Sequence, residues 1–186
     1  LLITAESSLE AVEIIKTGQL NFGLHLTLNS DFSEYPWKCA YKGRSSLNDG
    51  KGFLFSDTKE VAQKAKYRDV TLECEAQFAI LNEFGITPDH FDNHSGTMYG
   101  INLRPFFINA FKLSKKMNLP FRFPKRNTFL KDYFSGRVPG YITFAHKMIL
   151  GTAKMCGAKL IDDMISNPFS IKDIRSYEDL EEYYIN

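Results

Sequence analysis

The chain has 186 residues, of which 44% are hydrophobic and 24% are charged, and its formal net charge is +1. This length suits one domain with a sizeable core, and the charge excludes a broad basic surface for nucleic acid or membranes. No apolar run reaches the roughly 18 residues of a membrane-spanning helix, and the widely spaced Cys39, Cys74 and Cys156 are typical of reduced thiols in a cytoplasmic protein.

The first predicted elements are an apolar strand over residues 1–4 and a helix that ends at Gly18. Ser7 and Glu10 have the spacing of a capping box, which predicts a helix start near Ser7. A second strand is expected over residues 22–28, where three leucines alternate with smaller or polar residues. A single histidine in such a strand is more often a core residue than a ligand. His25, however, lies on the face opposite the leucines, so we expect it to face a cleft.

Residues 29–57 have no sustained hydrophobic period and are predicted to form a long loop over the site. Long irregular segments in a compact domain are usually functional or disordered. The aromatic residues Tyr35, Trp37 and Tyr41 are expected beside the cleft, because loops after the strands build the active face of a barrel.

The remaining elements alternate between helix and strand. A helical run is expected over residues 57–84, with a buried stripe formed by Val70, Cys74, Phe78 and Leu81. Further helices are predicted over residues 104–118, over 141–156 and from Ser176. Strands are predicted near residues 121–124 and 158–161, and residues 125–140 are expected to be irregular.

The most informative stretch covers residues 85–97. Gly85 and Pro88 end the preceding helix, and a short strand follows. Alternation along that strand predicts that His90, Asp92 and His94 share one face. This arrangement is typical of half a metallohydrolase site at a strand end. The alternative is a polar strand end with three unrelated surface groups.

Strands that alternate with helices predict a parallel sheet with crossover helices, which is an α/β fold. Ligand-type residues at strand ends favour a (β/α) barrel or a barrel-like sheet. A complete barrel needs about 250 residues, so this chain is expected to be an internal part of a longer protein, forming one domain over residues 1–186. An open doubly wound sheet is the alternative, although no dinucleotide-binding or phosphate-binding glycine motif is present.

Two motifs together, residues 23–28 (GLHLTL) and 85–94 (GITPDHFDNH), resemble the YdjC-like family of carbohydrate deacetylases, which includes chito-oligosaccharide deacetylases. The segment Glu73–Gln77 resembles the E-x-x-A-Q helix of that family, and residues 119–124 resemble its R-x-P strand. The resemblance covers most of the chain up to about Pro124. It implies a deformed (β/α) barrel of the polysaccharide-deacetylase type, incomplete in this chain.

The resemblance also implies a metal-dependent hydrolase that removes acetyl groups from N-acetylated mono- or oligosaccharides. His25 and His94 correspond to the two histidines that hold a divalent ion, Mg²⁺ or Zn²⁺. The family's third ligand and its catalytic aspartate belong to an N-A-D-D-F-G segment, which is expected upstream of Leu1. Gly96 replaces a second histidine that is common in the family's D-S-H-Q-H pattern.

Three residues are assigned supporting catalytic roles. His90 and Asp92 are expected to orient a ligating histidine, and Arg122 to steady an oxyanion or a sugar hydroxyl. A structural ion pair is the alternative for Arg122. The expected partner is an N-acetylated sugar, with no nucleic acid or membrane, and a homodimer is compatible with the sequence. The competing functions are a non-catalytic sugar-binding or scaffold module and another barrel metallo-amidohydrolase.

Overall fold

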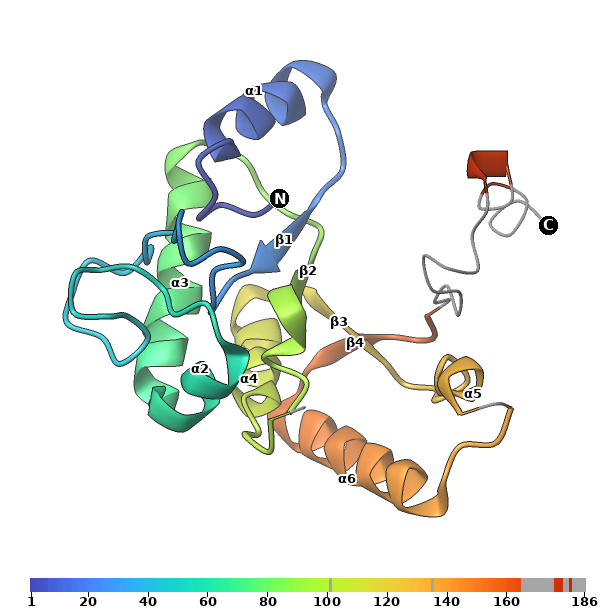
Figure 1. The fold of residues 1–186 in the computed structure, drawn as a ribbon. Helices are drawn as coiled ribbons and strands as arrows, with labels where there is room; N and C mark the ends of the chain where they lie inside the picture. Colours follow the sequence, from blue (N-terminus) through green and yellow to red (C-terminus); the bar gives the residue numbers. More distant parts are fainter. Residues whose placement is uncertain (101, 135, 165–175, 179–180, 182–186) are drawn as a thin grey trace.

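A computed structural model describes residues 1–100, 102–134, 136–164, 176–178 and 181. Within these residues four parallel strands form one sheet, in the same order as along the chain (Figure 1). The strands are β1 (Gly23–Leu26), β2 (His90–Asn93), β3 (Pro120–Pro124) and β4 (Lys159–Ile161). The expected α/β fold with a parallel sheet is therefore confirmed. Among the described strands, β1 and β4 are the edges of an open sheet.

Six helices and one 3₁₀ turn accompany these strands in the described part of the chain. The helices are α1 (Ser8–Gly18), α2 (Thr58–Lys64), α3 (Tyr67–Glu83), α4 (Phe107–Met117), α5 (Leu130–Tyr133) and α6 (Gly140–Cys156), and the turn is η1 (His94–Gly96). Helix α3 packs against β1, α4 packs against β3 and β4, and α6 packs against α4. No described helix is long and apolar enough to cross a membrane.

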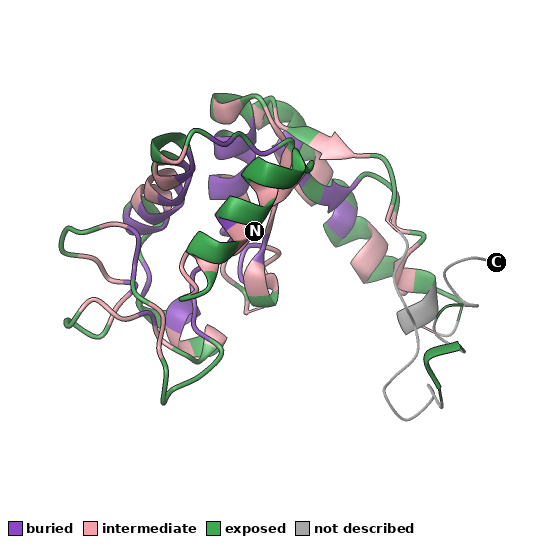
Figure 2. Cartoon of the chain, turned by 90° about the horizontal axis from the view of Figure 1, so that it is seen from above, coloured by how far each residue is buried: buried purple, intermediate pink, exposed green. Residues whose placement is uncertain are grey.

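The apolar face of the sheet forms the core with helices α3 and α4. Leu24, Leu26 and Phe91 are fully buried, as strand alternation predicts for one face. The ring of Phe91 lies 5.7 Å from that of Phe78 in α3 and stacks at 5.1 Å on that of Phe121 in β3. Figure 2 shows the buried residues concentrated between the helices and the strands. This packing fixes which strand residues point to the opposite, polar face.

The predicted strand over residues 1–4 is wrong. Leu1 makes two main-chain hydrogen bonds to β1, from its amino group to the Gly23 carbonyl and from the His25 N–H to its own carbonyl. The chain then turns at once, because the Ala5 N–H bonds back to the Leu2 carbonyl. A one-residue contact with β1 therefore replaces the expected strand.

Helix α1 forms where it was expected, but the capping box at its start does not. The Ser7 backbone has φ −77° and ψ 6°, and its side chain makes no cap hydrogen bond. A side-chain cap requires an extended backbone at that position. The spacing of serine and glutamate therefore located the helix without describing its first turn.

The helical run predicted over residues 57–84 is two helices, because the chain becomes extended at Ala65 and Lys66. The Ser46 hydroxyl accepts a hydrogen bond from the Lys66 N–H and donates one to the Asp69 carboxylate. These hydrogen bonds join the extended Lys66 and the first turn of α3 to Ser46. The predicted stripe Val70, Cys74, Phe78 and Leu81 is buried.

Several boundaries also differ. The helix predicted over residues 104–118 begins only at Phe107, and α5 interrupts the expected irregular segment 125–140. Helix α6 and strands β3 and β4 lie within a residue of their predicted places. The helix predicted from Ser176 falls largely outside the described residues. All three cysteines are free, and Cys39 and Cys74 are buried.

Candidate functional site

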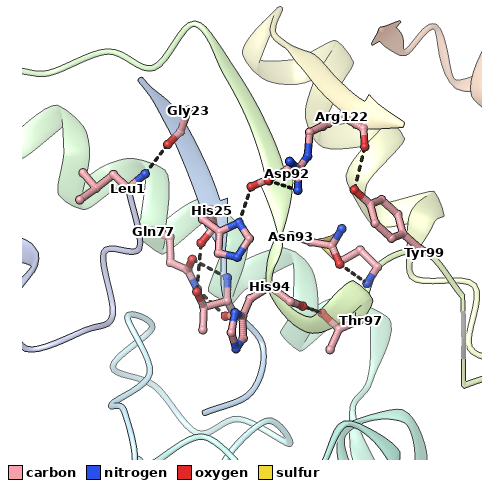
Figure 3. A network of polar contacts seen from close by, with 12 residues as sticks. Leu1, Gly23, His25, Gln77, Asp92, Asn93, His94, Thr97, Tyr99 and Arg122 are labelled. Carbon is pink, nitrogen blue, oxygen red and sulfur yellow. Dashed lines mark hydrogen bonds and ion pairs between the residues drawn. The ribbon is translucent and has the colours of Figure 1, made fainter. Parts of the chain in front are cut away.

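Two neighbouring strands bring a histidine and a carboxylate together on the polar face of the sheet. His25 of β1 and Asp92 of β2 are register partners, so their side chains emerge side by side. The distance from the His25 Nδ1 to the Asp92 Oδ1 is 2.5 Å (Figure 3). This contact places the two predicted residues in one site.

Arg122 of β3 completes this strand-built cluster. Its Nη2 lies 2.6 Å from the second carboxylate oxygen of Asp92, so one carboxylate bridges an imidazole and a guanidinium. Burial raises the pKa of Asp92, but the hydrogen bond from His25 and the charges of His25 and Arg122 outweigh it. The net pKa of Asp92 lies below its ordinary value. Asp92 is therefore ionised at neutral pH.

The ionised carboxylate determines which nitrogen of His25 carries the proton. A carboxylate only accepts hydrogen bonds, so the Nδ1–H of His25 donates to Asp92. The Nε2 of a neutral His25 then carries the free lone pair. A ligating histidine commonly has this arrangement, with its other ring nitrogen bonded to a carboxylate.

His94 reaches the same place from the end of β2. It opens η1, where Ser95 has a φ of +51°, and the chain leaves the strand direction there. The Asn93 side chain accepts the Met98 N–H, and the His94 carbonyl accepts the Thr97 hydroxyl, which together hold this turn. The rings of His25 and His94 converge at a centroid distance of 5.4 Å and an interplanar angle of 79°.

The loop after β1 supplies two neighbours of His94. The His94 Nε2 lies 2.6 Å from the Oδ1 of Asp31, and the ring of Trp37 lies 5.3 Å from that of His94. Trp37 was expected beside the site. Asp31 was missed by sequence reasoning, although a carboxylate five residues after the end of β1 in an irregular loop was an available signal.

The other two aromatic residues of this loop have different surroundings. Tyr35 is 75% exposed, and no contact with the site is seen for it among the described residues. The ring of Tyr41 lies over Gly43. Of the three aromatic residues expected at the cleft, the structure therefore places Trp37 against a site histidine.

Helix α3 anchors both ends of the region between β1 and Tyr41. Strand β1 ends at Leu26. The Gln77 side chain hydrogen-bonds to both the N–H and the carbonyl of the next residue, Thr27. The Glu73 carboxylate accepts the N–H groups of Ala40 and Tyr41 and the amide of Gln77. Both side chains are fully buried. Their positions on the helix did not by themselves reveal that they hold the loop.

His90 lies on the same strand as Asp92 but makes a different contact. Its Nδ1 pairs with the neighbouring Asp89, and its imidazole lies over Gly23. A Cβ at position 23 would approach the His90 Nε2 to 2.3 Å, so a larger residue there would require the half-exposed His90 ring to move. Among the described residues, His90 makes no direct hydrogen bond to His25 or His94.

The donors present suit part of a metal site. Each of the two converging imidazoles is bonded to a carboxylate, His25 to Asp92 and His94 to Asp31. Imidazole with such backing is a common ligand of divalent transition metals. Catalytic zinc sites usually have three protein ligands. The described part of the chain holds no group of three or more histidine, cysteine, aspartate or glutamate side chains arranged to hold an ion.

Comparison with known proteins agrees with this fold. The chain is similar to a solved structure from Enterococcus faecalis V583, named a "putative cellobiose-phosphate cleavage protein", with a TM-score of 0.67 and 23% identity. The match covers 98% of this chain and 61% of that protein, so the chain spans about three fifths of the length of its structural relative. No curated protein matches the chain.

The comparison by family model covers nearly the whole sequence. The model described as "YdjC-like protein" matches residues 1–173, which include both histidine motifs and all four strands. This is the family that the motifs around His25 and His94 resemble. The chain belongs to the YdjC-like family.

Proposed function

We propose that this chain is the histidine-bearing part of a metal-dependent carbohydrate deacetylase, which hydrolyses the acetamide of an N-acetylated mono- or oligosaccharide. The observation that carries the proposal is the convergence of His25 and His94, each backed by a carboxylate, on the polar face of the sheet. Family membership supports a carbohydrate-modifying hydrolase. The metal, the acetyl group and the sugar are the parts that require testing.

The two histidines would hold a divalent ion through their unprotonated ring nitrogens. When bound, such an ion supplies Lewis-acid polarisation of the amide carbonyl and a more acidic water. Two imidazoles favour Zn²⁺ over Mg²⁺, because Mg²⁺ prefers oxygen ligands. A complete site needs at least one further ligand, for which the resemblance suggests an aspartate upstream of Leu1.

The chain's own polar groups would position the substrate and handle protons. Asp92 holds His25 in one tautomer and draws Arg122 to the same edge of the cluster. The Arg122 side chain is 46% exposed, so guanidinium N–H groups not used by Asp92 can donate to a sugar hydroxyl or to a developing oxyanion. Trp37 adds an aromatic face of the kind that sugar rings pack against.

We also propose that the sheet is part of a deformed (β/α) barrel. The strand order equals the chain order, and crossovers between parallel strands are almost always right-handed. Successive units therefore wind in one direction, as in a barrel, whereas a doubly wound sheet reverses its strand order.

One observation favours a second candidate function. The described residues hold no set of three metal-ligating side chains, which is what a non-catalytic sugar-binding module on the same fold would show. Such a module would keep Trp37 and Arg122 as sugar contacts and would release no acetate. The two proposals differ in metal dependence.

The deciding experiment measures acetate release from N-acetylglucosamine and its oligomers, with Zn²⁺, with Mg²⁺ and with a chelator. The chain is tested alone and within a longer version that carries any upstream aspartates. We expect release only with metal, and His94→Ala should reduce it by about 10²-fold or more, because the substitution removes a ligand. Tyr35→Phe serves as the matched control, since Tyr35 is exposed on the same loop.

Two results would contradict the proposal. Acetate release that survives both the chelator and His94→Ala would eliminate the metal mechanism. Saturable sugar binding without acetate release, in a folded and metal-loaded protein, would establish the binding module instead.

A further inference from the structure

The loop after β1 contributes a charged group to the site in addition to covering it. Asp31 follows two fully or nearly fully buried polar residues, Asn29 and Ser30. The Asn29 amide donates to the Ser95 hydroxyl, which joins the start of the loop to η1. The Ser30 N–H donates to the Phe55 carbonyl, and its hydroxyl accepts the Trp37 N–H. These bonds fix the backbone that carries Asp31.

The fixed backbone places Asp31 against the more buried of the two site histidines. The His94 side chain is 12% exposed and that of Asp31 is 43% exposed, so the carboxylate approaches from the solvent side. Because a carboxylate only accepts, the bond at 2.6 Å requires the proton of a neutral His94 to lie on Nε2. The unprotonated nitrogen of His94 is then Nδ1.

The two histidines are therefore held in opposite tautomers. Asp92 accepts a hydrogen bond from the Nδ1–H of His25, which leaves Nε2 unprotonated. Asp31 accepts one from the Nε2–H of His94, which leaves Nδ1 unprotonated. Without a partner, neutral imidazole exchanges between its two tautomers. Two histidines whose tautomers are already fixed lose no tautomer freedom when they bind an ion.

We propose that Asp31 is the positioning residue of His94. Loop 29–57 thereby contributes to the metal site the carboxylate that orients one of its histidines. Asp31 selects the Nε2–H tautomer and the ring orientation of His94, so that Nδ1 is the nitrogen offered to a divalent ion. The role toward the ion rests on the proposed function, whereas the tautomer itself does not.

The test combines a tautomer measurement with a metal titration. Long-range ¹H–¹⁵N spectra of the histidine-labelled chain distinguish protonated from bare ring nitrogens at a pH about 1.5 units above the ordinary histidine pKa of about 6.5. His94→Gln assigns the His94 signals among the four histidines of the chain. We expect wild-type His94 to carry its proton on Nε2, and Asp31→Ala to populate both tautomers.

Calorimetric measurement of zinc affinity for the same variants tests the role of Asp31 in ion binding. Asp31→Ala should weaken Zn²⁺ binding by about 10- to 100-fold, the usual effect of removing a carboxylate behind a ligating histidine. Asp31→Asn should restore part of the affinity and keep the Nε2–H tautomer, because its amide oxygen still accepts. Glu34→Gln is the matched control, since it removes an exposed acidic charge from the same loop and should change neither readout.

The outcomes separate this inference from the proposed function. A proton on Nδ1 of wild-type His94, or a tautomer unchanged in Asp31→Ala, would overturn the assignment of Asp31. A changed tautomer with unchanged zinc affinity would overturn its role toward the ion. A wild-type chain that binds no zinc, alone or in the longer version, would remove the proposed metal function while the tautomer result stood.

Discussion

The site has two halves that are built differently. In the strand-built half, His25 and Asp92 are register partners of adjacent strands, and their positions follow from buried neighbours such as Leu24 and Phe91. In the loop-built half, His94 meets Asp31, a residue of an irregular segment. The carboxylate is mostly buried in the first half, at 13% exposed, and considerably more accessible in the second, at 43%.

The comparison shows how one fold can combine a side-chain pair built on strands with a pair completed by a loop. The strand-built half moves only if the core moves, because its backbone is in the sheet. The loop-built half is held by hydrogen bonds from Glu73 and Gln77 of α3 and by loop side chains that enter the core, among them Leu47 and Leu54. Asp31 is therefore placed by tertiary contacts of the loop, whereas His25 and Asp92 are placed by strand register.

The largest expected effect comes from the core behind the strand-built half. Phe91→Ala should lower the free energy of unfolding by about 3–5 kcal/mol, because it removes a fully buried ring that contacts Phe78 and Phe121. Phe32→Ala, in the loop, should change it by less than about 0.5 kcal/mol, since Phe32 is exposed. Urea unfolding measures both. Equal losses would contradict the difference in burial between Phe91 and Phe32.

The next effect tests the tether of the loop-built half. Glu73→Ala should cost about 1–3 kcal/mol, because it leaves the Ala40 and Tyr41 N–H groups and the Gln77 amide without an acceptor. Hydrogen exchange should accelerate at Ala40 and Tyr41 and stay slow at Phe91. Glu73→Gln retains one acceptor oxygen and should cost less. Uniform acceleration across the sheet would contradict separate halves.

A smaller effect is expected in the pH dependence of stability. The folded-state pKa of Asp92 is lowered, so its contribution is fully present above the unfolded value of about 3.9 and is lost as pH falls through the folded pKa. The wild-type advantage over Asp92→Asn should therefore narrow in acid. Unfolding free energies between pH about 6 and 3 measure this, and a constant difference would contradict it.

The contribution of Glu73 to the free energy of unfolding should change with pH in the opposite direction to that of Asp92. Burial raises the pKa of Glu73 despite the opposing hydrogen bonds from Gln77, Tyr41 and Ala40. A raised folded-state pKa favours the folded chain below the unfolded value, and this benefit is lost as pH rises through the folded pKa. The wild-type chain should therefore lose stability relative to Glu73→Gln as the pH rises through the folded-state pKa of Glu73. The same unfolding series detects it, and parallel slopes for Asp92 and Glu73 would contradict the assignment.

The smallest expected effect is spectroscopic. Trp37 is the only tryptophan of the chain, so its emission reports the loop-built half alone. An N-acetylglucosamine trimer should shift that emission, whereas a glucose trimer, which lacks the acetamide, should shift it less. Unchanged emission at a saturating concentration, with binding seen by calorimetry, would locate the sugar away from Trp37.

The sequence by itself determined which residues of β1 and β2 face the core, and it indicated that helices alternate with parallel strands. Alternation along residues 22–28 separated the buried leucines from His25, and the pattern around Phe91 did the same for Asp92. Parallel strands end at the same edge of a sheet, so the two histidine motifs were expected at one edge, and the structure showed that β1 and β2 are neighbours there. Hydrophobic periodicity is a local property, so a sequence displays it directly.

Only the tertiary structure decided the partners of those residues. No periodic signal marks the contact of Asp31 with His94 or the bonds of Glu73 and Gln77 to the loop, because contacts between distant segments depend on the path of the whole chain. The break between α2 and α3 likewise depends on Ser46, which lies about twenty residues earlier. Side-chain hydrogen bonds between distant segments are set by three-dimensional packing, and for this reason the tautomers of the two histidines were decided there.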